Sequence, residues 1–253
     1  MTSHLAILTG ASRGLGRAMA QQLLDAGHTL LCISRRADAT LAAHAQAGSA
    51  LTQWTHDLAD SVPLATRLAD WLSALDPAQL RSATLINNAG VIAPIAPLQG
   101  LAPDELPALA QALRVDLEAP MLLSAAFLRA SAEWTVPRRV LNISSGLGRR
   151  AMASQAGYCA AKAGMDHFTR CLALEQQALP NGARVCSLAP GVIDTEMQVT
   201  LRSADSARFA DAVNFAALKS RGMLASAEQA ARAVLAYLER PDFGEQPVAD
   251  VRG

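Results

Sequence analysis

Short apolar runs typical of strands alternate with longer helical patterns along the whole chain. Parallel strands need crossover connections, usually helices, and repeated strand–helix–strand units build a sheet that is covered on both faces. Strands are predicted at His4–Thr9, Thr29–Ser34, Leu51–His56, Thr84–Asn88, Arg139–Ile143, Arg184–Leu188 and Pro247–Val251. Helices are predicted at Gly14–Ala26, Ala39–Ala47, Ser61–Leu75, Pro103–Ser131, Gln155–Ala178 and Ala227–Arg240. The pattern predicts an α/β fold with one doubly wound sheet of about seven parallel strands.

The first predicted strand runs into a glycine-rich turn, and a helix begins directly after it. The turn reads Thr9-Gly10-Ala11-Ser12-Arg13-Gly14-Leu15-Gly16. Glycines let the backbone approach a pyrophosphate, and a helix N-terminus supplies free N–H donors. Alone, the turn could also be an ordinary strand-to-helix connection. In this context it predicts a single Rossmann-type dinucleotide-binding domain over residues 1–253, with these candidate cofactor contacts: Gly10, Ser12, Arg13, Gly14, Leu15 and Gly16.

The end of the second strand favours NADP(H) over NAD(H). Sites for NAD usually place an acid there to bind the ribose 2′-hydroxyl. Here the strand ends in Ser34-Arg35-Arg36, and Arg13 projects toward the same region. A guanidinium group suits a 2′-phosphate by charge and by bidentate geometry. The alternative is that Arg35 and Arg36 form a solvated turn.

Two further strand ends add candidate cofactor contacts. Asp57 and Leu58 follow the third strand, where an acid can accept the adenine amino hydrogen or cap the next helix. Asn88, Ala89 and Gly90 follow the fourth strand. All of these residues lie at the carboxyl edge of the predicted sheet, where such folds bind ligands.

A tyrosine and a lysine lie one helical turn apart in Tyr158-Cys159-Ala160-Ala161-Lys162, and Ser145 precedes them at the end of the fifth strand. Carbonyl reduction delivers a hydride to carbon and a proton to oxygen, so an acid must reach that oxygen. Lys162 lowers the pKa of a nearby phenol by stabilising the phenolate. Ser145 can donate a hydrogen bond to the substrate oxygen. These residues predict a reductase with Tyr158 as the general acid.

Taken in order, the glycine turn, Asn87-Asn88-Ala89-Gly90, Ser145, Tyr158 and Lys162 resemble the short-chain dehydrogenase/reductase family from Thr9 to Asp250. The resemblance implies that Lys162 also binds the nicotinamide ribose. It further implies that the turn containing Pro190, Gly191 and Ile193 holds the nicotinamide carboxamide, and that Thr195 contacts the carboxamide or a phosphate.

One position departs from the family pattern. The family usually has an asparagine in the helix after the fourth strand, where it holds a water that links the lysine to solvent. Asp116 stands there in this chain. An ionised carboxylate beside Lys162 would offset the cation that Tyr158 needs. We therefore expect Asp116 to keep this catalytic relay and to change its pH dependence.

The residues after Thr195 and those at the chain end are most like the branch that contains sepiapterin reductase and benzil reductase. That resemblance implies reduction of a ketone or a vicinal dicarbonyl beneath a substrate lid at 195–224. By position, Asp250 would anchor the substrate, although it could equally be a polar strand end. Met152 and Met197 are candidate substrate contacts, with core packing as the alternative.

Two other activities stay open. One is a short-chain reductase or dehydrogenase for another substrate, such as a secondary alcohol or a 3-oxoacyl thioester. The positive charges of Arg149 and Arg150 could bind the acidic carrier protein of such a thioester. The other is a non-catalytic NADP-binding sensor, because a fold does not fix a function.

Composition limits the partners. Lys and Arg total 22, as do Asp and Glu, so the formal net charge is zero and binding of nucleic acid is not expected. With no signal-peptide pattern and no apolar run near the ~18 residues of a membrane span, we expect a cytoplasmic protein without membrane contact. The four cysteines form no CxxC pair, and no metal site is expected.

The chain is also expected to form an oligomer. Charged residues make up only 17% of it, which is few for the surface of a monomer. The family resemblance implies that the helices Pro103–Ser131 and Gln155–Ala178 pack against a second subunit. A homodimer or homotetramer is therefore expected.

Overall fold

The computed structural model describes residues 2–45 and 50–252 and contains a seven-stranded parallel sheet. The strand order is β3-β2-β1-β4-β5-β6-β7, so the order reverses between β1 and β4. The strands are β1 (Ser3–Thr9), β2 (Thr29–Ser34), β3 (Leu51–Thr55), β4 (Leu80–Asn87), β5 (Arg138–Ile143), β6 (Arg184–Ala189) and β7 (Val248–Asp250). The predicted fold class is confirmed, and ligands of such sheets bind beyond the carboxyl ends at the reversal.

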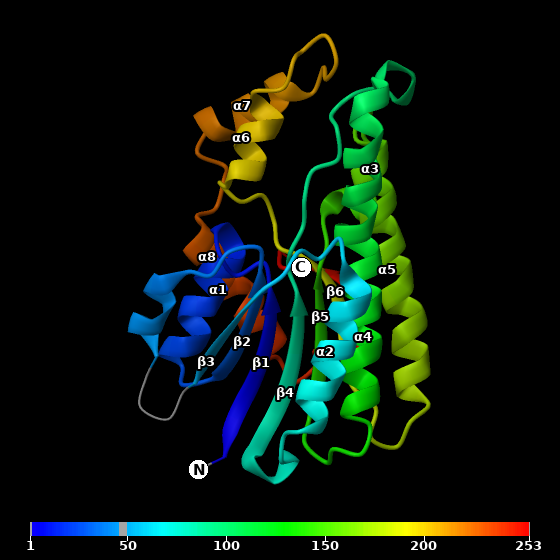
Figure 1. Ribbon diagram of the computed structural model, residues 1–253. Helices are drawn as coiled ribbons and strands as arrows, with labels where there is room; N and C mark the ends of the chain where they lie inside the picture. The colour runs from blue at the N-terminus through cyan, green and yellow to red at the C-terminus, as the bar shows by residue number, and fades with distance from the viewer. Residues whose placement is uncertain (1, 46–49, 253) are drawn as a thin grey trace.

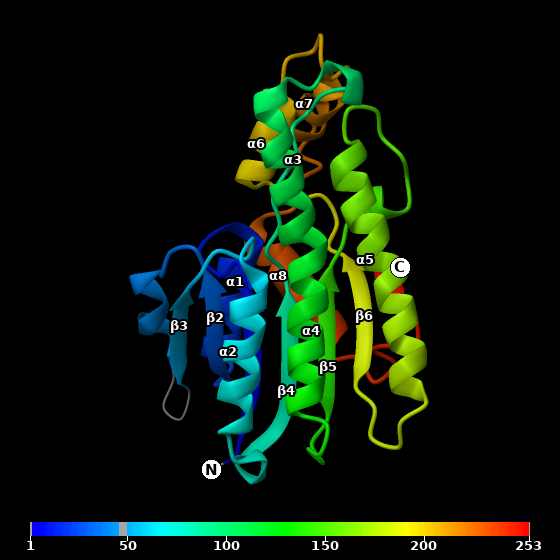
Figure 2. The same ribbon diagram turned by 45° about the vertical axis from the view of Figure 1, so that its right-hand side comes forward.

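Helices cover both faces of the sheet (Figures 1 and 2). One face carries α1 (Gly14–Asp25) and α8 (Ala227–Leu238), and the other carries α2 (Ser61–Ser73), α4 (Ala119–Ala130) and α5 (Ala156–Gln177). Successive strand residues point to opposite faces. In β1, Ala6 and Leu8 therefore join one core, whereas Leu5 and Ile7 join the other. Because both faces are buried, the inner strands β1 and β2 are nearly continuous apolar runs, whereas the edge strand β3 is partly exposed.

The segment predicted as one helix over Pro103–Ser131 contains a wider turn. It consists of a 3-10 turn η4 (Pro103–Glu105), α3 (Leu106–Leu113), a π-helical turn η5 (Arg114–Glu118) and α4. The physical reason is Pro120, which has no N–H to donate to the carbonyl four residues earlier, that of Asp116, and whose ring clashes with it. Such π turns are frequent at functional sites.

The helix predicted at Ala39–Ala47 is a 3-10 turn, η1 (Ala39–His44), and residues 46 and 47 lie outside the described ones. The Asp38 carboxylate accepts the N–H of Thr40 and so caps this short turn. Three further 3-10 turns are η2 (Pro77–Gln79), η3 (Leu98–Gly100) and η6 (Gly146–Gly148). Among the described helices, none is both long and apolar enough to cross a membrane.

Two short helices, α6 (Glu196–Arg202) and α7 (Ala212–Ser220), stand above the carboxyl ends of the strands (Figure 1). Buried Leu201, Phe209 and Ala212 form a separate apolar cluster, against which Ile92, Ile95 and Met152 pack. The two ends of the segment meet at one bridge between Ile193 and Ala225. There the N–H of Asp194 donates to the carbonyl of Ala225 over 2.9 Å.

Candidate active site

A cleft of about 2250 Å³ lies over the carboxyl ends of the strands and extends beneath α6 and α7. Every residue that the sequence assigned to the cofactor lines it: Gly10, Ser12, Arg13, Gly14, Leu15, Gly16, Ser34, Arg35, Arg36, Asp57, Leu58, Asn88, Ala89, Gly90, Tyr158, Lys162, Pro190, Gly191, Ile193 and Thr195. Ser145, Met152 and Met197 line it as well. Asp116 and Asp250 are not among its lining residues.

The glycine turn leaves the first peptide groups of α1 open to the cleft. Gly10 and Gly14 have φ angles of +73° and +52°, a region that favours glycine. A Cβ at Gly16 would clash with the carbonyl oxygen of Gly10 and the side-chain amide of Asn88. No side chain caps the helix at Arg13. The N–H groups at the start of the helix are therefore free to meet an anion.

The sequence reasoning missed Thr9, which braces the turn against β4. Its hydroxyl oxygen accepts the backbone N–H groups of Asn88 and Ala89, each over 3.0 Å. The Asn88 amide in turn donates to the carbonyl of Thr9 over 2.9 Å. Asn88 therefore holds two strand ends together besides lining the cleft. Thr9 opens the glycine motif, so its position was a usable signal.

Arginines dominate the cleft at the end of β2. Arg35 and Arg36 are exposed there. Asp38 lies four residues after Ser34, and its carboxylate already has two partners in the chain. It lies 2.7 Å from Nε of Arg17 and accepts a hydrogen bond from the Thr40 hydroxyl. Hydrogen bonds from Thr40 lower the pKa of Asp38, although its desolvation opposes them. Arg13 forms an ion pair with Glu196 at the start of α6.

Asp57 caps the turn that follows β3, one of the two roles considered from the sequence. Its carboxylate accepts the N–H of Ala59 over 3.0 Å and so caps the turn before α2. It also lines the cleft, beside the buried Leu58.

The sheet and α5 bring Ser145, Tyr158 and Lys162 to the same cleft. Lys162 is buried, and its Nζ donates to the carbonyl of Ile143 over 3.0 Å. That nitrogen lies 5.7 Å from the centroid of the half-buried Tyr158 ring. The Ser145 hydroxyl oxygen accepts the N–H of Leu147 over 3.2 Å, so its own proton is free to be donated elsewhere.

The surroundings raise the pKa of Tyr158, whereas the sequence led us to expect that Lys162 would lower it. Desolvation contributes most, the negative charge of Asp116 adds to it, and a hydrogen bond with Ser145 acts in the opposite direction. A phenol with a raised pKa stays protonated at neutral pH. This is the state that a proton donor needs.

Asp116 lies in the π turn, with 1% of its surface exposed. One carboxylate oxygen accepts the N–H of Val91 over 2.8 Å, while the other has no hydrogen-bond partner among the described residues and lies 3.9 Å from Nζ of Lys162. Burial raises the pKa of Asp116, and Lys162 partly offsets that rise. The carboxylate thus meets Lys162 behind the cleft wall.

At the end of the chain, Asp250 is paired with Arg252. Its carboxylate accepts from the Arg252 guanidinium over 2.8 and 2.7 Å and from the Arg252 N–H over 3.0 Å. Arg252, which the sequence reasoning did not single out, lines the cleft in its place. Gln155 and Ile92 were also missed, since they follow no motif and only the tertiary fold brings them there.

Open N–H groups at a glycine turn and a tyrosine–lysine pair on one cleft define a nicotinamide-dependent oxidoreductase. Residues 4–206 match the family model for short chain dehydrogenases, and the chain belongs to that family.

Three similar proteins describe its neighbourhood. Benzil reductase ((S)-benzoin forming) of Bacillus cereus is 36% identical over 96% of this chain and 96% of its own. Sepiapterin reductase of Xenopus tropicalis is 33% identical over 79% of this chain and 78% of its own. A solved short-chain dehydrogenase/reductase from Burkholderia vietnamiensis is 34% identical, with a TM-score of 0.65 over 99% of this chain and 97% of its own. The predicted family and branch are confirmed.

Proposed function

We propose that the protein is an NADPH-dependent carbonyl reductase that transfers hydride to a ketone or vicinal dicarbonyl of the benzil or sepiapterin kind. The observation that carries this proposal is the common cleft. Ser145, Tyr158 and Lys162 face it together with the glycine turn at the start of α1.

The cofactor end fits a dinucleotide with a 2′-phosphate. The free N–H groups at the start of α1 suit the pyrophosphate. Arg35 and Arg36 would bind the 2′-phosphate, and Arg13 would exchange Glu196 for it. Asp38 does not compete for a ribose hydroxyl, because Arg17 and Thr40 occupy it. NADPH supplies the hydride when it is bound.

The chain's own groups manage the proton. Ser145 donates a hydrogen bond to the substrate oxygen and stabilises the negative charge that develops there. Tyr158 gives its proton to that oxygen, and Lys162 stabilises the resulting phenolate. Lys162 would also bind the nicotinamide ribose, while Pro190, Gly191, Ile193 and Thr195 hold the carboxamide side.

The substrate end includes an apolar surface that suits the hydrophobic part of a carbonyl compound. Met152, Met197 and Leu201 present apolar surface to the cleft beside Phe215. We assign residues 195–224 as the lid of this single-domain enzyme. The two named relatives act, by their names, on benzil and sepiapterin, which is the further support for a vicinal dicarbonyl.

The test is an absorbance assay of NADPH oxidation with benzil, a matched monoketone, sepiapterin and a 3-oxoacyl thioester, plus NADP⁺ with secondary alcohols. Turnover that is fastest with a vicinal dicarbonyl supports the proposal. If the enzyme prefers the thioester or an alcohol, that compound class replaces the vicinal dicarbonyl as the proposed substrate. Tight NADPH binding without any turnover identifies a sensor and overturns the proposal.

We also propose a homodimer or homotetramer formed through the segments 103–131 and 155–178. These segments expose large apolar side chains, with Leu174 on α5 70% exposed and Leu106 on α3 52% exposed. Exposed large apolar side chains on both segments are the observation that supports this proposal.

A further inference from the structure

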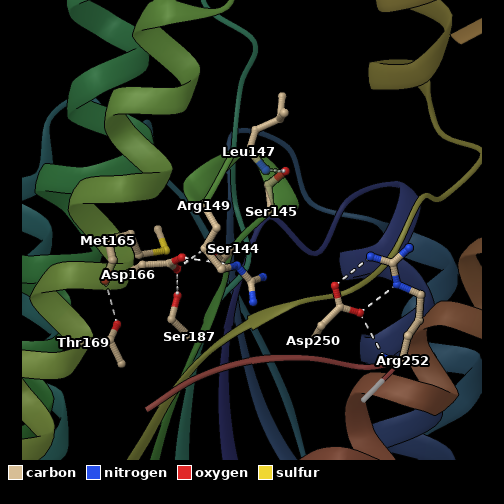
Figure 3. A network of polar contacts seen from close by, with 10 residues as sticks. All are labelled: Ser144, Ser145, Leu147, Arg149, Met165, Asp166, Thr169, Ser187, Asp250 and Arg252. Carbon is tan, nitrogen blue, oxygen red and sulfur yellow. Dashed lines mark hydrogen bonds and ion pairs between the residues drawn. The ribbon is translucent and has the colours of Figure 1, made fainter. Parts of the chain in front are cut away.

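Helix α5 carries a buried carboxylate, that of Asp166, on the same face as Tyr158 and Lys162. Asp166 lies one turn after Lys162 and is 1% exposed, and none of the steps above uses it. One of its carboxylate oxygens accepts two hydroxyl protons, from Ser144 and from Ser187, each over 2.6 Å (Figure 3). The carboxylate therefore bridges the end of β5 and the neighbouring strand β6.

The same carboxylate also meets the far end of the turn that follows β5. Its second oxygen lies 3.8 Å from Nε of Arg149, directly after the turn Gly146–Gly148. A Cβ at Gly148 would stand 2.8 Å from that oxygen, so the turn packs closely on Asp166. Both ends of the turn, Ser144 and Arg149, are thus tied to one buried group.

Ser145 is enclosed by these contacts. It follows Ser144 directly, and the Ser144 N–H is itself fixed to the carbonyl of Leu188 over 2.9 Å. Because Asp166 and Tyr158 belong to the same rigid helix, a carboxylate that fixes the turn also fixes the Ser145 hydroxyl relative to the Tyr158 hydroxyl. Displacements of about 1 Å at reacting groups cost rates of about 100-fold.

We propose that Asp166 is a positioning residue that sets the Ser145 hydroxyl against Tyr158 for the substrate oxygen. The inference rests on the proposed function, in which Ser145 and Tyr158 share that oxygen. To bridge the two strands, residue 166 needs only an oxygen that accepts two hydroxyl protons. To fix the turn, it also needs the negative charge that attracts Arg149. The two contributions can be separated by mutation.

A matched pair of serine variants makes the first test. Ser144→Ala and Ser187→Ala each remove one 2.6 Å hydrogen bond to the same oxygen, and both serines are buried. Only Ser144 adjoins the turn. We expect Ser144→Ala to lower kcat about tenfold with the KM for NADPH unchanged, and Ser187→Ala to stay within about twofold of wild type. Equal losses from both variants would refute the positioning role.

A double-mutant cycle makes the second test. Asp166→Asn keeps an acceptor oxygen but loses the charge, and we expect kcat to fall about tenfold or more. In a Ser145→Ala background the same change should cost less than about twofold, because the group that it positions is already absent. Additive losses would show that Asp166 only supports the fold. If Asp166→Asn does not fold, the cycle is run with Ser144→Ala.

Thr169→Val is the control for general damage to α5. Thr169 is buried one turn further along and accepts the Asn142 amide over 2.9 Å, away from the turn. It should lower the melting temperature without changing kcat. If the wild-type enzyme turns over no carbonyl compound, both the proposed function and this inference are refuted. If the wild type is active and the losses in the double-mutant cycle are additive, only this inference is refuted.

Discussion

Nζ of Lys162 lies 3.9 Å from the carboxylate of Asp116, and both side chains are almost completely buried. The cation that we propose to stabilise the Tyr158 phenolate therefore lies beside a buried carboxylate. Since Asp116 raises the pKa of Tyr158, this contact adjusts the acidity of the proton donor.

Asp116→Asn should shift the pH dependence of carbonyl reduction. Removing a negative charge near the phenol lowers the pKa of Tyr158. Reduction needs protonated Tyr158, so the rate falls as pH rises through this pKa, and the fall should begin at lower pH in the variant. The measurement is kcat/KM for hydride transfer against pH. Glu118→Gln, in the same π turn but hydrogen-bonded to Ser61, is the control. Identical apparent pKa values for Asp116→Asn and wild type would exclude this coupling.

Tyr158→Phe should abolish most of the turnover. The variant keeps the ring and loses the proton, and general acid catalysis contributes about 10²- to 10⁴-fold to a rate. NADPH binding, followed by fluorescence, should stay within a few-fold. The chain has two tyrosines, so Tyr237→Phe on α8 is a matched control. A variant that retains wild-type kcat would mean that another group donates the proton.

Replacing Arg35 or Arg36 by alanine should weaken the binding of NADPH but not that of NADH. A hydrogen bond to a charged group contributes about 1.5–3 kcal/mol, so each variant should raise the Kd for NADPH about tenfold or more. Arg67→Ala removes an arginine that stacks on Trp54, 4.0 Å from its ring centroid, and serves as the control. Titration with both cofactors is the measurement. Equal losses for NADPH and NADH would contradict recognition of the 2′-phosphate.

Gly16→Ala should damage both the fold and the cofactor site. The new Cβ would displace the Gly10 carbonyl or the Asn88 amide, and overpacking of this kind costs about 1–3 kcal/mol of unfolding free energy. Binding of NADPH should fall with it. Gly100→Ala, with no neighbour nearer than 3.9 Å, should change the unfolding free energy by less than about 0.5 kcal/mol. Denaturant unfolding of both variants tests this, and equal stabilities would show that the turn has room to yield.

Leu174→Glu should dissociate the oligomer. Leu174 is 70% exposed on α5, where a carboxylate would be buried at the proposed contact without a partner. Sedimentation of wild type at micromolar concentration should give a dimer or tetramer, and the variant should shift toward monomer. Val62→Glu, on α2 and 63% exposed, should not change the assembly. A monomeric wild type would remove the expectation altogether.

Local spacing predicted most of the fold and the cofactor end. The strand alternation and the glycine turn depend on neighbours in sequence, so the sheet and the residues from Gly10 to Gly16 followed from the chain alone. The pairing of Asp250 with Arg252 could not be predicted, because it depends on side-chain geometry rather than on a motif. The network of Asp166 was missed because Ser144, Ser187 and Arg149 meet it only after three elements pack.

The bridge between Ile193 and Ala225 lies outside the seven strands and joins the two ends of the region between these residues. Because its ends are already joined, changing the length of that region alters the entropy of closing a loop only slowly. The proposed catalytic groups, Ser145 after β5 and Tyr158 and Lys162 on α5, lie outside this region. We therefore expect that residues 196–224 can be exchanged as one segment to change the substrate range, while Thr195 and the other proposed cofactor contacts stay in place.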